Sequence, residues 1–424
     1  MDNLRARVTP MLQRSFARSP RGALLALVAV LLLCSVSPAA RIPRVAALDN
    51  GVARTPPMGW NSWYGLGCDM KQQDVREIAD ALVTSGLRDA GYTYVNLDDC
   101  WAEGRRSDGT IVPDAVRFPD GIPALANYVH ARGFKFGLYT DAGATTCAGR
   151  PGSLDHEQQD AMTYAFWGVD FVKEDWCDTE GLDPSVQYGK FRDALAAASA
   201  TYRHPIVFSI CDPALDQPWA WGPSTGNLWR TSEDIVLGRN GWQRMLEVLD
   251  ENAAHASAAG PGAWNDPDNL QTGLGAKRGS SGMTELEERA QFSMWTIMAA
   301  PLIIGADPRT MSDFTRQTLT NADAIAIDQD PAGVQGTLVK QDSTDLLQVW
   351  SKPLQAPGSR AVALFNRGDE PTNLTVAWRD IRLPLGWARV KDVWAGTEPT
   401  YFFDRYSAGV PAHAVALLVI TASS

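Results

Sequence analysis

Histidine, basic residues and long apolar runs are all scarce in this chain of 424 residues. The five histidines lie far apart, with no pair at ligand spacing on one element, which argues against a zinc hydrolase. Lys and Arg number 38 against 49 Asp and Glu, and no basic stretch follows the N-terminal segment, which argues against a nucleic-acid partner. The residues GPSTG (222–226) have the letters of a G-x-S-x-G motif, but they precede a strand-like run and do not directly follow one, so a serine triad of the α/β-hydrolase kind is not indicated.

The N-terminus has the pattern of a secretory signal. Arginines precede an apolar run over residues 23–36, and small residues follow it at Ser37, Ala39 and Ala40. The run is shorter than the roughly 20 residues of a membrane span. We therefore predict a signal peptide over residues 1–40 and a secreted protein without a stable membrane span. Cys34 leaves with this segment, and the remaining cysteines suffice for two disulfides and one free thiol.

From about residue 49 the sequence alternates short β-rich runs with amphipathic helical stretches. Val75, Ile78 and Leu82 follow helical spacing, and residues 284–300 show a similar pattern. Eight such units over residues 49–330 predict an α/β fold, a (β/α)8 TIM barrel. The candidate strands are Met58–Trp63, Tyr92–Asp99, Phe134–Asp141, Phe171–Trp176, Ile206–Cys211, Leu228–Asp234, Ala263–Leu270 and Leu302–Ala306.

Beyond about residue 334 the helical period disappears. Strand-like runs alternate with turn residues there, which predicts a small C-terminal antiparallel β-sandwich over residues 334–424. Its clearest runs are Leu346–Trp350, Ala361–Phe365, Leu374–Trp378 and Ala414–Ile420. The expected order is thus a signal peptide, a catalytic barrel and a sandwich.

Acidic residues gather at the carboxyl ends of the candidate barrel strands. These ends form the active-site mouth of a (β/α)8 barrel. One Asp at a strand end also fits a turn or a helix cap, but several together favour a functional cluster. Two carboxylates at one bond are the minimum for glycoside hydrolysis, and their separation, which distinguishes retention from inversion, is not visible in a sequence. The residues are Asp98, Asp99, Asp141, Lys173, Asp175, Asp212, Arg230, Asp234, Asp266 and Asp268.

A series of motifs runs through the barrel region. They are TPPMGWNSWYGLGC (55–68), NLDDCW (96–101), RFPDGI (117–122), GLYTDAG (137–143), TCAGRPGS (146–153), WGVDFVKEDWC (167–177), LWRTSEDI (228–235) and WNDPDNL (264–270). In these motifs the chain resembles glycoside hydrolase family 27, the α-galactosidase (melibiase) family, and the C-terminal region resembles the family's second domain. The resemblance implies a glycosidase that needs no cofactor and no metal.

The resemblance also implies the catalytic pair of a retaining mechanism, with Asp175 as nucleophile and Asp234 as general acid/base. On a strand, Lys173 shares the face of Asp175, where an ammonium group helps to keep the nucleophile ionised. By the same alternation Arg230 shares the face of Asp234 and can bind neighbouring hydroxyls. Glycosylation removes the charge of Asp175, so Asp234 then becomes more acidic and suits the role of base.

Sugar contacts and disulfides follow from the same resemblance. Asp98 and Asp99 would accept hydrogen bonds from the 4- and 6-hydroxyls of galactose, and a carboxylate left unpaired by an epimer rejects that epimer. Trp63 would lie against the apolar face of the ring. The other implied substrate-binding residues are Tyr139, Lys173, Asp212, Arg230 and Asp268. The implied disulfides are Cys68 to Cys100 and Cys147 to Cys177, which leaves Cys211 as the odd thiol.

Three positions depart from the family's pattern. Asp212 stands where a glutamate is usual, Asn269 where a methionine is usual, and Glu174 where an aromatic residue is common. We expect a retaining exo-α-galactosidase that removes terminal α-D-galactosyl residues from small-molecule or oligosaccharide substrates. A β-L-arabinopyranosidase with the same mechanism is the nearer alternative, and a non-catalytic carbohydrate-binding protein is the alternative of another class. For the active site itself, the alternative to a metal-free site is one that holds a divalent ion through carboxylates alone.

Overall fold

The computed structural model describes residues 47–236, 240–277, 281–396 and 398–423. The predicted signal peptide, with Cys34, lies outside these residues, so its prediction stays open. Within the described part of the chain, no helix is both long enough and apolar enough to cross a membrane.

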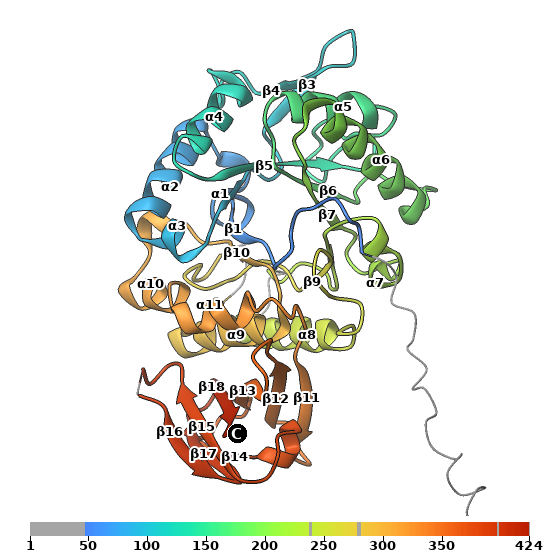
Figure 1. The fold of residues 1–424 in the computed structure, drawn as a ribbon. Helices are drawn as coiled ribbons and strands as arrows, with labels where there is room; N and C mark the ends of the chain where they lie inside the picture. Colours follow the sequence, from blue (N-terminus) through green and yellow to red (C-terminus); the bar gives the residue numbers. More distant parts are fainter. Residues whose placement is uncertain (1–46, 237–239, 278–280, 397, 424) are drawn as a thin grey trace, which may run out of the picture. The chain divides into compact units, whose positions relative to one another are not determined.

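Eight parallel strands form one sheet in the order β10-β1-β2-β5-β6-β7-β8-β9 (Figure 1). A parallel bridge between Leu270 and Ile304 joins the two edges of this sheet, which closes it into the predicted barrel. Each of the eight predicted runs contains one of these strands. Their bounds are β1 Met58–Asn61, β2 Tyr94–Asn96, β5 Lys135–Asp141, β6 Phe171–Asp175, β7 Val207–Cys211, β8 Leu228–Arg230, β9 Trp264–Asp266 and β10 Leu302–Ile304.

Helices connect the barrel strands and lie outside the sheet (Figure 1). In α2 the apolar residues Val75, Ile78 and Leu82 are fully buried, as their spacing predicts. The α-helices are α1 Trp63–Leu66, α2 Gln72–Thr84, α3 Leu87–Ala90, α4 Gly121–His130, α5 Glu157–Phe166, α6 Pro184–Tyr202, α7 Pro218–Trp221, α8 Gly241–Ala253, α9 Glu285–Met298, α10 Asp313–Leu319 and α11 Ala322–Asp328. A short hairpin, β3 Ala102–Arg105 with β4 Ile111–Pro113, follows β2.

All eight predicted strands are longer than the observed ones, and at β1 and β8 the difference corrects the predicted placement of site residues. β1 ends at Asn61, because the Asn61 side chain accepts a hydrogen bond from the backbone N–H of Trp63 and so turns the chain into α1. β8 ends at Arg230, so Asp234 lies in a loop. The prediction that Arg230 and Asp234 share a strand face is therefore wrong, although the two side chains do meet.

The C-terminal region contains the predicted antiparallel sandwich. A six-stranded sheet in the order β11-β12-β13-β18-β15-β16 packs with the pair β14-β17 over a core that includes Leu364, Val376 and Leu418. The bounds are β11 Thr337–Gln341, β12 Leu347–Pro353, β13 Ser359–Asn366, β14 Thr372–Ala377, β15 Trp387–Asp392, β16 Thr400–Phe403, β17 Arg405–Val410 and β18 Ala414–Ala422. The predicted bounds of 49–330 for the barrel and 334–424 for the sandwich stay predictions.

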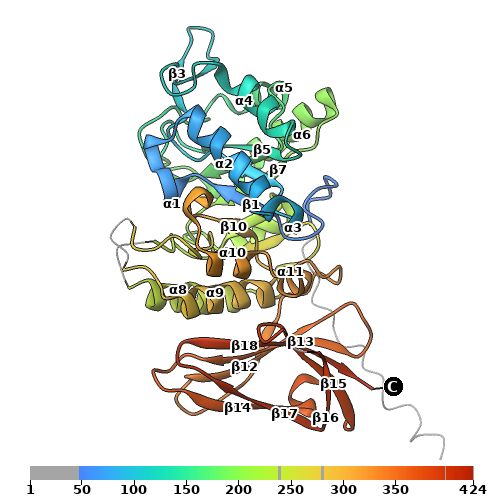
Figure 2. The same ribbon diagram turned by 90° about the vertical axis from the view of Figure 1, so that its left-hand side faces the viewer.

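The barrel and the sandwich share one apolar core. Trp350, Phe365 and Leu417 of the sandwich belong to the same buried cluster as the barrel residues. Helix α9 lies beside β12, β13 and β18, as Figure 2 shows. The buried Lys352 of β12 donates hydrogen bonds to the carbonyl oxygens of Thr296 (3.0 Å) and Asp328 (3.3 Å), which ties the two parts together.

Candidate active site

Asp175 lies at the carboxyl end of β6, where the register sets Tyr139 opposite Lys173. The Tyr139 hydroxyl donates to Oδ2 of Asp175 at 3.0 Å, and the backbone N–H of Trp176 donates to Oδ1 at 3.0 Å. Lys173 Nζ lies 3.8 Å from Oδ2 of Asp175. Burial raises the pKa of Asp175 above its ordinary value, and the charge of Lys173 offsets part of this increase.

Lys173 also holds Asp98, which follows β2. Its Nζ donates to Oδ2 of Asp98 at 3.0 Å, and the side-chain amide of Asn61 donates to the same oxygen at 2.8 Å. The backbone N–H of Asp98 donates to Ser62 Oγ at 2.9 Å. Asp98 and Asp175 therefore share one lysine, whose charge offsets part of the effect of burial on Asp175. The structure brings together Asp98, Lys173, Tyr139 and Asp175, as the sequence predicts.

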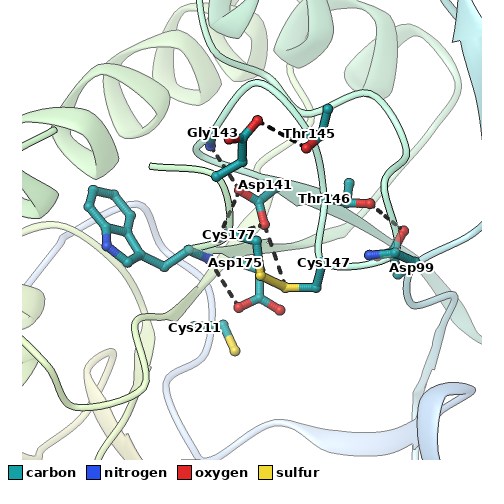
Figure 3. The surroundings of a disulfide bond; sticks show 12 residues. Asp99, Asp141, Gly143, Thr145, Thr146, Cys147, Asp175, Cys177 and Cys211 are labelled. Atoms are coloured by element: carbon teal, nitrogen blue, oxygen red, sulfur yellow. Dashed lines mark hydrogen bonds between the residues drawn. A yellow bond between two sulfur atoms is a disulfide. The ribbon is translucent and has the colours of Figure 1, made fainter. Parts of the chain in front are cut away.

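Asp99 faces a different partner, the loop that carries Cys147. Its carboxylate accepts hydrogen bonds from the Thr146 hydroxyl and the Ala148 N–H, both at 2.9 Å. The contact with Thr146 is drawn in Figure 3. Burial raises the pKa of Asp99 despite these bonds. Disulfides join Cys68 to Cys100 and Cys147 to Cys177, as the resemblance implies, and Cys211 is a free buried thiol. Asp99 thus anchors the loop that a disulfide joins to Cys177, just after β6.

Asp141 is the last residue of β5 and joins this strand to the end of β6 (Figure 3). Its Oδ1 accepts hydrogen bonds from the N–H groups of Gly143 (2.8 Å) and Cys177 (3.1 Å). Burial and the charge of Asp175 raise the pKa of Asp141 to about 8. The sequence argument placed Asp141 at a strand end but gave it no role, and the structure shows that it fixes the segment directly after Asp175.

Asp234 lies across the site on the loop after β8, and its side chain is 43% exposed. Arg230 NH1 donates to Oδ1 of Asp234 at 2.9 Å. Burial raises the pKa of Asp234, but the charges of Arg230 and Lys173 outweigh burial, so this pKa lies below its ordinary value. The two implied catalytic carboxylates thus have opposite pKa shifts in the ligand-free protein.

Arg230 has a second carboxylate partner, Asp268. Arg230 NH2 lies 3.2 Å from Oδ2 of Asp268, and the same oxygen accepts hydrogen bonds from the Tyr64 hydroxyl at 2.5 Å and the Ile235 N–H at 2.9 Å. Arg230 and Asp268 are both nearly fully buried. The cluster Tyr64, Asp268, Arg230 and Asp234 therefore forms one continuous set of contacts.

Two other implied residues are Asp212 and Trp63. Asp212 is fully buried after β7, and its Oδ1 accepts a hydrogen bond from the Leu215 N–H at 3.0 Å. Its Oδ2 has no hydrogen-bond partner among the described residues, and burial raises its pKa to about 6. Trp63 is the first residue of α1 and is partly buried.

Two surface pockets lie away from these carboxylates. One of about 440 Å³ is lined by residues that include Phe166, Trp167 and Tyr202, and another of about 450 Å³ lies along α6. A smaller hollow is lined by Lys173, Arg230 and Asp268 among others, so the titratable cluster and a concave surface coincide there. In the described chain, the one group at metal-ligand spacing contains the disulfide-bonded Cys147 and Cys177, whose sulfur atoms are already paired.

The sequence matches known proteins along most of its length. Residues 55–330 match the family model "Alpha galactosidase A", and residues 344–420 match "Alpha galactosidase C-terminal beta sandwich domain". The chain belongs to the α-galactosidase (melibiase) family. It is a glycoside hydrolase of the α-galactosidase type.

Relatives of this family resemble the chain closely. The α-galactosidase of Cyamopsis tetragonoloba is 45% identical over 379 residues, which cover 89% of this chain and 88% of the relative. Alpha-galactosidase A of Cellvibrio japonicus is 47% identical over 335 residues, which cover 77% and 80% of the two chains. The structure of α-galactosidase from Saccharomyces cerevisiae has a TM-score of 0.81 and 30% identity, over 89% of this chain and 100% of that one.

Two residues of this α-galactosidase-type site, Asn61 and Tyr64, were absent from the sequence prediction, and Asp141 was predicted at a strand end without a role. Asn61 and Tyr64 lie within the first motif, and Asp141 lies within GLYTDAG. Their positions were visible in the motifs, but their roles depend on contacts with Asp98, Asp268 and the segment after Asp175. Only the folded chain reveals these contacts, because each joins two different strands or loops.

Proposed function

We propose that the chain is a retaining exo-α-galactosidase, with Asp175 as nucleophile and Asp234 as general acid/base. The observation that carries this proposal is the contrast between the two carboxylates. Asp175 is held in place by Tyr139 and the Trp176 N–H beside Lys173, as a nucleophile requires. Asp234 is 43% exposed, which leaves it accessible to a leaving group and to water.

The reaction proceeds in two displacements. Asp175 attacks the anomeric carbon while Asp234 donates a proton to the glycosidic oxygen, so that the C–O bond breaks and the aglycone leaves. Asp234, now a carboxylate, removes a proton from water, and the resulting nucleophile attacks the same carbon and frees Asp175. The free sugar keeps its original anomeric configuration.

Substrate binding must change the protonation of Asp234. In the ligand-free site Arg230 and Lys173 lower the pKa of Asp234, whereas the first step needs its protonated form. A bound sugar offers hydroxyl groups to Arg230 and Lys173 and excludes water from Asp234, and both effects raise its pKa. Loss of the Asp175 charge in the glycosyl-enzyme lowers that pKa again, which prepares Asp234 to act as base.

We assign recognition of the 4- and 6-hydroxyls of galactose to Asp98 and Asp99, and we place Trp63 against the apolar face of the sugar ring. Asp98 lies beside Lys173 and Asp175 and is nearly fully buried, which supports its assignment. Asp212 accepts a hydrogen bond from the Leu215 N–H of its own loop. A β-L-arabinopyranosidase is the second candidate function. Both candidates use the same catalytic pair and differ in the sugar.

The test compares aryl α-galactopyranoside and β-L-arabinopyranoside as substrates for the wild type, Asp175→Ala and Asp234→Ala. Both variants should lose activity by several orders of magnitude, while the exposed control Asp193→Asn stays active. Azide should then restore turnover, giving the β-galactosyl azide with Asp175→Ala and the α-galactosyl azide with Asp234→Ala. The reverse pattern would exchange the roles, and sugar binding without turnover in the wild type would refute the proposal.

We also propose that the protein is secreted after cleavage within its leader. Support comes from the arginines, the apolar run and the small residues of residues 1–40. Mass spectrometry of the exported chain should find a new N-terminus near Ala40. A full-length chain retained in cells would contradict this.

A further inference from the structure

Tyr64 is a buried tyrosine whose hydroxyl ends at the active site. It lies in α1, directly after Trp63, and only 3% of its surface is exposed. Its hydroxyl donates to Oδ2 of Asp268 at 2.5 Å, across 204 residues of sequence. A hydrogen bond from a neutral hydroxyl to a buried carboxylate is strong, because no water competes for either group.

The oxygen that Tyr64 contacts is also the one that faces Arg230. Arg230 divides its two terminal nitrogens between carboxylates, with NH2 at 3.2 Å from Oδ2 of Asp268 and NH1 at 2.9 Å from Oδ1 of Asp234. Asp268 and Asp234 therefore compete for one guanidinium group. If the attraction between Asp268 and Arg230 becomes weaker, the attraction between Arg230 and Asp234 becomes stronger.

We propose that Tyr64 is a positioning residue that acts through Asp268 and Arg230 to set the pH at which Asp234 loses its proton. The Tyr64 hydroxyl neutralises part of the charge on Oδ2 of Asp268, which leaves Arg230 free to hold Asp234. Without this hydroxyl, Asp268 draws Arg230 toward itself, and Asp234 keeps its proton to a higher pH. The inference rests on the proposed role of Asp234 as general acid/base.

Other charges also act on Asp234, and all of them remain when Tyr64 is changed to Phe. They come from β6, β7, β8, α8 and the loop after β9. The groups are Lys173, Asp175, Cys211, Arg230, Arg244 and Asp268. A change in the titration of Asp234 in Tyr64→Phe therefore reports the missing hydroxyl.

A purely structural role for Tyr64 is the competing explanation, and Tyr92 provides a matched control. Tyr92 is equally buried, and its hydroxyl donates to the Leu319 carbonyl oxygen at 2.9 Å. Tyr92→Phe removes one buried hydrogen bond, whose acceptor is a backbone carbonyl oxygen in α10. Both substitutions should lower stability, but only Tyr64→Phe should alter the pH profile.

The experiment measures kcat/KM against pH with nitrophenyl α-galactoside for the wild type, Tyr64→Phe and Tyr92→Phe. The alkaline limb should move upward by about 0.5 pH unit or more in Tyr64→Phe, a roughly threefold change in the protonated fraction of the acid. It should not move in Tyr92→Phe. An unchanged limb in a folded Tyr64→Phe protein, or an equal shift in Tyr92→Phe, would overturn the proposal.

Asp268→Asn gives a second and opposite test, which also serves if Tyr64→Phe fails to fold. An amide at this position removes the competing charge, so Arg230 binds Asp234 more strongly and the alkaline limb should move downward. An upward shift or no shift in Asp268→Asn would overturn the proposed coupling.

Asp234→Asn separates failure of the inference from failure of the proposed function. If Asp234 is the acid, Asp234→Asn should abolish the alkaline limb, whatever residue stands at position 64. A limb that persists in Asp234→Asn refutes the acid/base assignment and the inference with it. A limb that vanishes in Asp234→Asn but stays in place in Tyr64→Phe refutes the inference alone.

Discussion

Glu174 is a buried carboxyl group that stands between Lys173 and Asp175 on β6. Strand alternation turns its side chain away from the face that carries its two neighbours. It is fully buried, and neither carboxylate oxygen has a hydrogen-bond partner among the described residues. Burial raises the pKa of Glu174 well above its ordinary value, and the charge of Asp141 adds to the increase. Burial therefore favours the protonated, neutral form of Glu174 beside Asp175.

This predicts a pH-dependent effect of Glu174→Gln. The pKa of Glu174 is higher in the folded than in the unfolded chain, so protonation of Glu174 stabilises the folded protein. This stabilisation is complete below about pH 4 and is lost as the pH rises through the folded-state pKa. Gln cannot ionise, so the difference in melting temperature between Glu174→Gln and the wild type should increase with pH in favour of the variant. At pH 8 we expect this difference to have grown by roughly 2 °C or more. Calorimetry from pH 5 to pH 8 measures this. The exposed control Glu103→Gln should show no such slope, and a slope as large as that of Glu174→Gln would contradict the interpretation.

Helix α9 depends on its N-terminal cap. Thr284 accepts a hydrogen bond from the Glu287 N–H at 3.3 Å, and Glu287 accepts one from the Thr284 N–H at 2.7 Å, which is a capping box. The other oxygen of Glu287 meets His413 Nδ1 at 2.7 Å in the sandwich. One glutamate thus both caps the helix and joins it to the second domain.

Thr284→Ala should therefore lower the free energy of unfolding by about 1 kcal/mol, although Thr284 is exposed. Urea denaturation checks this value. The neighbouring exposed substitution Glu285→Gln should change stability by less than about 0.5 kcal/mol. Equal losses in the two variants would show that the cap contributes nothing.

The barrel and the sandwich are joined by polar contacts as well as by a shared core. Arg367 pairs with Asp250 of α8 through two contacts, at 3.0 Å and 2.7 Å. Lys352 is fully buried, and burial lowers its pKa to about 8. Most of α9 is buried because the barrel covers one side of the helix and the sandwich covers another.

We therefore predict that the chain unfolds in one cooperative transition. A chain ending at residue 333 should not fold, because it exposes the apolar face of α9 that Trp350, Phe365 and Leu417 cover. Differential scanning calorimetry should give one peak with equal calorimetric and van't Hoff enthalpies. Two separate peaks, or a folded barrel without the sandwich, would contradict this prediction.

Much of the architecture was predictable because it depends on local periodicity. The alternation of apolar runs and helical patterns located all eight barrel strands, and α9 was predicted over 284–300 against an observed Glu285–Met298. Strand ends were less predictable. β1 ends where the Asn61 side chain accepts a hydrogen bond from the Trp63 N–H, and Asp234 lies in a loop where it accepts one from Arg230. Hydrogen bonds of this kind leave no periodic pattern in the sequence.

The sequence alone established the class of fold, the family resemblance and the acidic residues at the strand ends, because these follow from short-range patterns and ordered motifs. The tertiary structure decided which charges share a partner. Lys173 lies between Asp98 and Asp175, and Arg230 lies between Asp234 and Asp268. Coulombic coupling and burial depend on distances across the barrel, and residues far apart in the chain acquire those distances only when the sheet closes.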